Sequence, residues 1–264
     1  MEDAAARRGD RTAELQVLTA DHYDAHPFDF LTPEDEARIE NSQPRPFRRF
    51  VEKYLRPGQQ VGEIGCGPGR GTLFLMRHGL AVTAVDLSLA SLLLARRRAP
   101  VAYVAATNLR LPMPDGVFDA VVSDGVIHHT PDPRRAFREN ARVLKPGGYL
   151  YLGVYNRQGY YYYLYTYVGV PIRGLDKRPW GRVLIHATLL PIYYLVHLVK
   201  TRGKRTWRGA RHFFYDYIIT PRASFHSKEE IEGWASAEGL SLLDYDPAVG
   251  NVHAFIFRKS SQSH

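Results

Sequence analysis

Residues 63–71 read EIGCGPGRG, a glycine-rich stretch between a strand-like run and a helix-like run. The preceding run, Gln60 to Ile64, is typical of a short strand, and the following one continues as a helix through Leu80. Glycine at such a junction lets the backbone approach a ligand closely, and the first turn of the helix directs unpaired N–H groups at that ligand. The stretch therefore predicts an α/β fold with a ligand-binding loop after its first strand.

An acidic residue at the end of the next strand indicates which kind of ligand the loop binds. Residues 81–86 read AVTAVD, and their last residue, Asp86, can accept hydrogen bonds from both hydroxyls of a ribose. The glycine loop and this acid together predict a nucleoside-cofactor site. Glu63, directly before the loop, would repel a pyrophosphate but suits an ammonium group. S-adenosylmethionine (SAM) carries a ribose, an ammonium and a sulfonium, and no phosphate.

Strand-like and helix-like runs alternate from residue 59 to 155, which predicts a parallel sheet covered by helices on both faces. The helix predicted from about Arg134 to Leu144 is expected to end at the KPGG stretch 145–148, with glycine as a left-handed cap. We divide the chain into an N-terminal helical lid segment (1–57), a cofactor-binding core (58–155), a substrate-side helical insertion (156–226), and a return to the core with a helix and the last two strands (227–264).

Composition excludes several classes of protein. The chain has 264 residues and a net charge of +8, with the apolar content of a globular protein. Its single cysteine, Cys66, excludes an intramolecular disulfide framework and a multi-cysteine zinc site, and we expect no metal. The first ten residues are charged and lack the apolar region of a secretory signal, so we expect a cytoplasmic protein.

The basic charge is concentrated in one segment. Residues 173–222 contain 11 Lys and Arg against 2 acidic residues, a net of +9. Within them, residues 183–199 (VLIHATLLPIYYLVHLV) are almost continuously apolar, at the short limit for crossing a bilayer. The internal Pro191 favours a buried or lid-forming helical pair. Contact with a membrane surface is the alternative, because residues 200–205 (KTRGKR) follow directly.

Five motifs follow one another in the core and together resemble those of a known enzyme family. They are VGEIGCGPG (61–69), AVDLS (84–88), LPMPDGVFD (111–119), GVIHHTPDP (125–133) and ARVLKPGG (141–148). This set resembles the class I SAM-dependent methyltransferases. The resemblance implies a Rossmann-like, seven-stranded, mostly parallel sheet whose last strand is antiparallel, with helices on both faces. The insertion then falls between strands five and six.

The resemblance also implies which residues bind the cofactor. They are the backbone of Gly65, Gly67 and Gly69, the small loop residue Cys66, Glu63 at the loop or the ammonium, Asp86 at the ribose, Leu87 beside the adenine, Thr107 or Asn108 at the adenine edge, and Asp124 at the methionine end.

The chain departs from the family pattern at two positions. A bulky aliphatic residue commonly stands where this chain has Gly62, so we expect looser packing of that strand. The family also commonly has an Asp after the third strand to bind the adenine amine, whereas residues 104–108 read VAATN. Asn108 has an amide oxygen that could accept the same hydrogen bond.

Aromatic and histidine residues are the candidates for catalysis and substrate binding. His128 and His129 follow the fourth strand, and either could act as a general base. The alternative is that the pair shapes its loop. Tyr23 is a candidate contact to the methyl-bearing end of the cofactor, and with His26 a candidate for substrate binding. The alternative for these two is an aromatic contact that fastens the lid to the core.

The sequence favours methylation of O, N or C of a small, aromatic or lipophilic molecule by direct SN2 transfer. An RNA methyltransferase using residues 173–222 is a second hypothesis, but DGVI stands at 124–127 instead of an amino-methylation signature, which disfavours nucleic acid. A SAM-binding protein without methyl transfer is a third. An NAD-dependent oxidoreductase conflicts with Glu63. The tyrosine-rich run 160–163 suits a substrate wall or a homodimer interface.

Overall fold

One mixed sheet forms the centre of the computed structural model, which describes residues 2–27, 36–37, 39–203, 206–249 and 251–261. The strands are β1 (Gln60–Ile64), β2 (Ala81–Asp86), β3 (Ala102–Ala105), β4 (Phe118–Asp124), β5 (Leu144–Tyr155), β6 (Leu240–Val249) and β7 (Val252–Lys259). They lie in the order β3-β2-β1-β4-β5-β7-β6. The first five pair in parallel, and β7 is antiparallel to both β5 and β6. The predicted seven-stranded sheet is confirmed.

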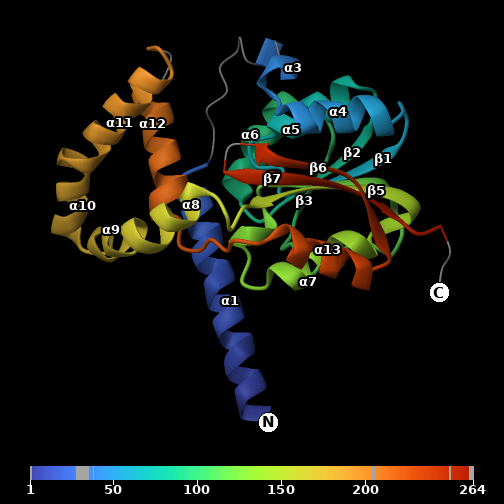
Figure 1. Cartoon of the computed structure of the whole chain (residues 1–264), viewed down its shortest axis with the longest axis horizontal. Helices are drawn as coiled ribbons and strands as arrows, with labels where there is room; N and C mark the ends of the chain where they lie inside the picture. Colours follow the sequence, from blue (N-terminus) through green and yellow to red (C-terminus); the bar gives the residue numbers. More distant parts are fainter. Residues whose placement is uncertain (1, 28–35, 38, 204–205, 250, 262–264) are drawn as a thin grey trace.

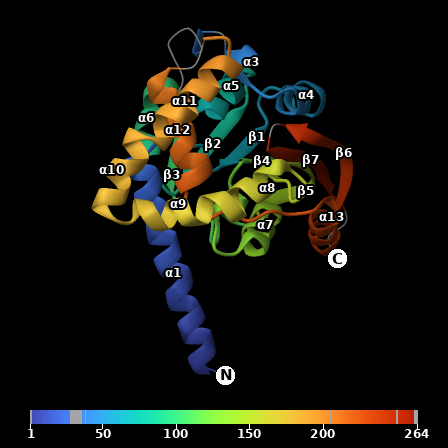
Figure 2. The ribbon, with the colours of Figure 1, turned by 60° about the vertical axis from the view of Figure 1, so that its left-hand side comes forward.

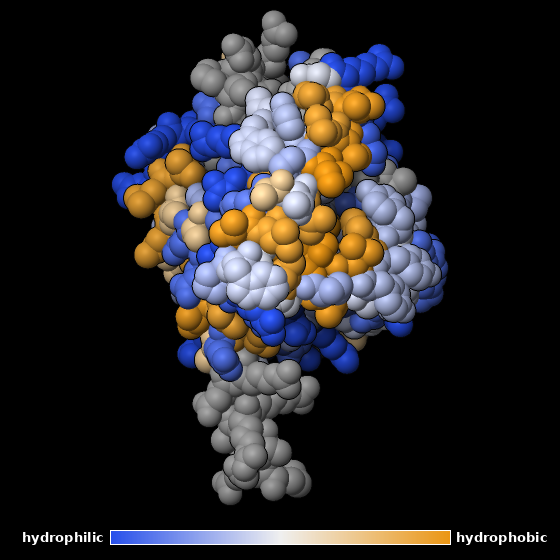
Figure 3. Space-filling model, turned by 90° about the vertical axis from the view of Figure 1, so that its left-hand side faces the viewer, coloured by the Kyte–Doolittle hydropathy of each residue, from blue (hydrophilic) through white to orange (hydrophobic). Residues whose placement is uncertain are grey.

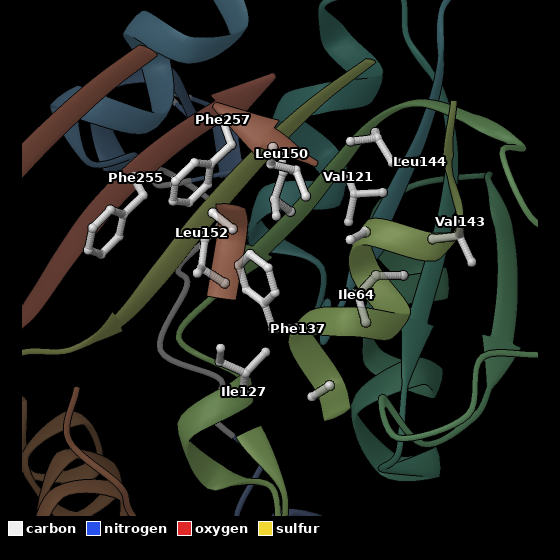
Figure 4. Packing of buried hydrophobic residues seen from close by; sticks show 14 of the residues in the cluster. Ile64, Val121, Ile127, Phe137, Val143, Leu144, Leu150, Leu152, Phe255 and Phe257 are labelled. Carbon is white, nitrogen blue, oxygen red and sulfur yellow. The ribbon is translucent and has the colours of Figure 1, made fainter. Parts of the chain in front are cut away.

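Helices cover both faces of this sheet (Figure 1). On one side lie α4 (Arg45–Tyr54), α5 (Arg70–Arg77) and α6 (Leu89–Arg98), and on the other α7 (Pro133–Arg142) and α13 (Lys228–Ala237). Side chains alternate between the two layers, because successive residues of a strand point to opposite faces. In β4, Ala120 and Val122 pack with α4 and α5, whereas Val121 packs with α7 and α13. Figure 4 shows Phe137 of α7 reaching toward Leu152 of β5.

Two local expectations were wrong. α7 ends at Arg142, and Leu144 already pairs with Phe118 of β4, so Gly147 (φ +77°) lies in an irregular part of β5 and caps no helix. Pairing with β4 therefore overrides the local helix signal. The strand at Gly62 is also not loosely packed. The Phe118 ring fills the space where a larger side chain would stand, 2.7 Å from the position of a Cβ.

The remaining elements lie beside the sheet. They are α1 (Glu2–Ala25), α3 (Ile39–Ser42), η1 (Ile127–His129), α8 (Tyr160–Tyr163), η2 (Leu164–Val168), α9 (Gly169–Asp176), α10 (Pro179–Ala187), α11 (Leu189–Lys200), α12 (Trp207–Phe214) and η3 (Tyr215–Ile219). The elements from α8 to η3 follow β5 and form a separate helical layer next to α1 (Figures 1 and 2). This placement of the insertion agrees with the prediction.

The carboxyl-terminal end of α1 joins the core to the insertion. Asp24 accepts a hydrogen bond from the hydroxyl of Ser88, at the start of α6, over 2.6 Å. Two residues later the His26 ring packs on Tyr215 of η3, with 4.3 Å between ring centroids. The amino-terminal turns of α1 project away from the rest of the molecule (Figure 1). One helix thus fixes the position of the insertion over the edge of the sheet.

Candidate active site

A cavity of about 410 Å³ lies at the carboxyl ends of β1, β2 and β4, between the sheet, α1 and the insertion. Such an edge is where ligands bind in open α/β sheets. The predicted residues that line the cavity are Tyr23, Glu63, Gly65, Cys66, Gly67, Asp86, Leu87, Thr107, Asn108, Asp124 and His129. Three other predicted residues, His26, His128 and Gly69, are outside its lining.

The glycine loop is built from left-handed backbone. Gly65, Gly67 and Gly69 have φ angles of +83°, +52° and +86°, which L side chains rarely adopt. A Cβ at Gly65 would lie 2.3 Å from Val126, and one at Gly69 would lie 2.8 Å from Ala95. A Cβ at Gly67 would meet no protein atom within 4 Å. Two of the glycines therefore allow close packing of the loop, while Gly67 keeps the backbone open to the cavity.

Asp86 both supports this loop and faces the cavity. Its Oδ2 accepts a hydrogen bond from the backbone N–H of Gly67 at 2.7 Å, and its Oδ1 accepts one from Ser88 at 2.8 Å. Burial raises the pKa of the Asp86 carboxyl, and these backbone N–H groups oppose that rise. The carboxylate is therefore held in one orientation, with oxygen lone pairs available to the two hydroxyls of a ribose.

Two further carboxyl groups, that of the buried Glu63 and that of the partly buried Asp124, make this end of the cavity suit a cation. Glu63 accepts a hydrogen bond from the hydroxyl of Thr72, and burial raises its pKa to about 8. Burial also raises the pKa of Asp124, while the nearby Arg70 opposes that rise. An ammonium or sulfonium entering here would favour the charged forms of these acids. A pyrophosphate would meet repulsion from them.

The opposite end presents an unpaired amide. Asn108 is 8% exposed, and neither its side-chain nitrogen nor its oxygen has a hydrogen-bond partner among the described residues. Buried polar atoms are normally paired, and because Asn108 lines the cavity, a ligand bound there can supply the partner. An adenine offers an amine donor and ring-nitrogen acceptors, which such an amide can match. Thr107 differs, because its hydroxyl already accepts hydrogen bonds from Gln16 of α1 and from the backbone of Leu109.

These features fit SAM. Gly67 leaves room at the loop, Asp86 suits the ribose, Asn108 the adenine, and Glu63 and Asp124 the positive charges. Cys66 lies in the loop as a buried thiol whose pKa is raised strongly by burial, so it is no nucleophile at neutral pH. No group of three or more potential metal ligands occurs within the part of the chain that the structure describes.

The other half of the cavity is aromatic, with one partly buried acid. Its walls include Tyr155, Phe213 and Tyr217. Tyr23 donates a hydrogen bond over 3.3 Å to Oδ1 of Asp216, which comes from η3 of the insertion. Burial raises the pKa of Asp216 to about 7, although the Tyr23 hydrogen bond opposes this shift. The residues contributed by the insertion were not predicted, because the sequence carries no motif that shows which of its faces meets the core.

The two histidines of η1 occupy different environments. His129 lines the cavity, and its Nδ1 contacts the Arg222 carbonyl oxygen at 2.8 Å. A carbonyl oxygen only accepts hydrogen bonds, so Nδ1 of His129 carries the proton and Nε2 keeps a lone pair. Burial lowers the pKa of His129 to about 4, which keeps the ring neutral. His128 is fully buried, and its Nδ1 accepts from the Tyr155 backbone N–H at 3.2 Å. This contact and its stacking on the Tyr155 ring hold η1 against β5.

Comparisons with known proteins agree with this site. Residues 62–152 match the family model described as a methyltransferase domain. The ubiquinone biosynthesis O-methyltransferase of Coxiella burnetii is 32% identical over 202 residues, which cover 74% of this chain and 70% of that protein. The chain belongs to the class I SAM-dependent methyltransferases. SAM is therefore its cofactor, and methyl transfer its reaction.

Other relatives share parts of this methyltransferase. The demethylmenaquinone methyltransferase of Renibacterium salmoninarum is 36% identical over 111 residues, which cover 41% of this chain and 47% of the relative. The crystal structure of magnesium protoporphyrin IX methyltransferase from Synechocystis, with bound SAM, has a TM-score of 0.57 at 13% identity. That match covers 93% of this chain and 97% of the solved chain, and it shows the fold.

Replacing Asp86 by Ala tests the ribose contact. We expect calorimetric titration to show that the wild type binds SAM and S-adenosylhomocysteine and not NAD. Asp86→Ala should weaken both affinities by about 10- to 100-fold, because hydrogen bonds to a charged group are lost. Asp115→Ala, an exposed acid outside the cavity, is the control and should bind normally. Equal binding by both variants would contradict the assignment.

Asn108→Ala tests the adenine contact. The loss of neutral hydrogen bonds should weaken SAM binding by up to about tenfold. Wild type should also bind S-adenosylhomocysteine more tightly than S-inosylhomocysteine, which lacks the amine, and the variant should bind the two alike. Asn140→Ala removes another buried, unpaired amide that lies outside the cavity, so it should keep the wild-type preference. A preference retained by Asn108→Ala would refute the contact.

Proposed function

We propose that this methyltransferase transfers the methyl group of SAM to a hydroxyl oxygen of a small aromatic or lipophilic molecule. The observation that carries the proposal is the aromatic half of the cavity, where Tyr23 donates a hydrogen bond to the partly buried acid Asp216. Aromatic walls suit a flat or apolar acceptor, and a few placed polar groups fix its orientation. The name of the Coxiella burnetii relative, an O-methyltransferase, supports oxygen as the acceptor atom.

Two polar groups can act on the hydroxyl of such an acceptor. His129 offers the lone pair of Nε2, which accepts a hydrogen bond and orients the hydroxyl. Asp216 has a pKa near neutrality and can take the proton during the reaction. Tyr23 is a positioning residue, because its hydrogen bond fixes the carboxyl group of Asp216. We therefore assign general-base catalysis to Asp216 and hydroxyl orientation to His129.

The transfer is a single displacement. Bound SAM supplies a methyl group already activated by the positive sulfur. The acceptor oxygen forms the new bond to the methyl carbon while the bond from that carbon to sulfur breaks, leaving its electron pair on sulfur. The acceptor proton goes to the carboxylate of Asp216. The residues of the cavity contribute alignment and exclusion of water, and alignment alone can supply roughly 7–11 kcal/mol.

A panel of acceptors tests the proposal. We expect S-adenosylhomocysteine and a methylated product, detected by mass spectrometry, with hydroxylated aromatic compounds. The matched methyl ethers, whose hydroxyl is blocked, should give neither, and aromatic amines and short RNA transcripts should give no methylated product. Methylation of the ethers or the amines would show that oxygen is not the acceptor. Methylation of RNA would favour the basic segment as a nucleic-acid surface.

Asp216→Asn tests the general base with the best acceptor of that panel. In the wild type, kcat/KM should rise with pH through about 7, because Asp216 accepts a proton only when it is ionised. The variant should lose this dependence and about 10²- to 10⁴-fold in kcat, with SAM affinity unchanged. Asp176→Asn makes the same change in the insertion outside the cavity lining and should keep the wild-type profile. A variant with an intact pH dependence would exclude Asp216 as the base.

A further inference from the structure

The outward side of the insertion is apolar. The segment Pro179–Lys200, formed by α10 and α11, has the length and composition of a helix that could cross a membrane. Only 11% of its most apolar stretch is buried inside the protein. We define its outer face by Trp180, Val183, Leu184, Ile192, Leu195 and Val199, which are between 46% and 79% exposed. Their spacing of three and four residues within each helix places them on one side. A monomer rarely leaves such a continuous apolar surface in water.

The inner face of the same two helices is already used. Ile185 of α10 and Leu190 of α11 are buried against Phe214 of α12 and Ile218 of η3, so both helices are packed along one side on the rest of the insertion. The segment also bends where they meet, since Thr188 has φ −122° and ψ −65°, and Pro191 follows in the first turn of α11. A bent pair fastened along one side fits a surface contact better than a membrane span.

Charge around the outer face identifies the partner. Lys177 and Arg178 are exposed at one end of α10–α11, and Lys200 and Arg202 at the other. Figure 3 shows hydrophobic side chains across this face with hydrophilic ones at its margins. The two acidic residues of the segment 173–222 are turned inward, because Asp176 is buried beside Arg182 and Asp216 lines the cavity. The rim is therefore positive, as contact with anionic headgroups requires.

We propose that the outer face of α10–α11 docks on the surface of a membrane that contains anionic lipid. The six apolar side chains enter the boundary between headgroups and acyl chains, and the basic rim pairs with the headgroups. Docking on a membrane is independent of the proposed methylation, because membrane binding requires no methyl acceptor. It also gives the insertion a second role, because Phe213 and Tyr217 on its other side line the cavity. An acceptor dissolved in lipid would then meet the enzyme beside its active site.

Vesicle flotation of the full chain tests the docking. With phosphatidylcholine–phosphatidylglycerol vesicles the wild type should float, and with phosphatidylcholine alone its affinity should be lower by about tenfold or more. High salt should weaken binding to the anionic vesicles. Wild-type protein that stays unbound with both vesicles would overturn the proposal. Binding that survives both high salt and alkaline carbonate would also overturn it, since it would indicate a membrane span.

Matched variants locate the contact. Val183→Glu with Val199→Glu changes two side chains of the outer face, which are 68% and 79% exposed, and should reduce binding to anionic vesicles by about tenfold or more. Leu89→Glu with Leu93→Glu adds the same charge on α6, where both leucines are 60% exposed, and should bind like the wild type. If both variants lost vesicle binding equally, the loss would be due to net charge alone, and the outer face of α10–α11 would not be the contact surface.

Thermal unfolding and SAM titration show whether the variants fold, so that loss of vesicle binding cannot arise from unfolding. Sedimentation velocity then separates a membrane contact from self-association. We expect a monomer at all concentrations used for flotation. A wild-type dimer that Val183→Glu with Val199→Glu dissociates would show that a second copy covers this face, and the proposal would fail. The docking proposal and the methylation proposal can fail independently of each other. Flotation does not depend on product formation, and the acceptor panel contains no lipid.

Discussion

Three carboxyl groups, those of the buried Glu63 and the partly buried Asp86 and Asp124, lie together at the carboxyl edge of the sheet, and the site depends on this arrangement. Parallel pairing of β1, β2 and β4 brings the ends of these strands to one edge. Removing these acids from water is costly, which is why burial raises the pKa of each, and the nearby Arg70 offsets only part of the rise at Glu63 and Asp124. A ligand with an ammonium and a sulfonium relieves that cost. The arrangement therefore favours SAM over a phosphate-bearing cofactor on electrostatic grounds.

The second half of the cavity depends on α1. Its residues Gln16 and Tyr23 donate hydrogen bonds to Thr107 and Asp216 of the cavity, and Asp24 accepts one from Ser88 at the start of α6. The same helix contacts η3 through His26, so the insertion is held where Asp216 faces the cavity. α1 therefore contributes side chains to both ends of the cavity.

The insertion has two faces with different chemistry. Its inner side supplies aromatic walls and an acid to the cavity, and its outer side leaves valine, leucine and tryptophan side chains in solvent. The hydrophobic effect would normally turn such residues inward. Their position is consistent with a partner that is itself apolar and negatively charged at its surface. A lipophilic acceptor and a lipid-facing cover would then be two aspects of one adaptation.

The sequence by itself determined the core. Glycines before a helix, an acid at the end of β2 and regular strand–helix alternation are local signals, so β1, β2 and the loop after β1 could be predicted from the sequence. The residues predicted to bind the cofactor, apart from Gly69, line one cavity. Gly147 shows the limit, because pairing of Leu144 with Phe118 ended α7 before the glycine that would have capped it. Only the tertiary structure decided that Asp216 and Tyr23 meet, since they are 193 residues apart. It also decided that the apolar run 183–199 has one buried and one exposed side, because burial depends on what packs against a helix, and the sequence of the helix does not contain that information.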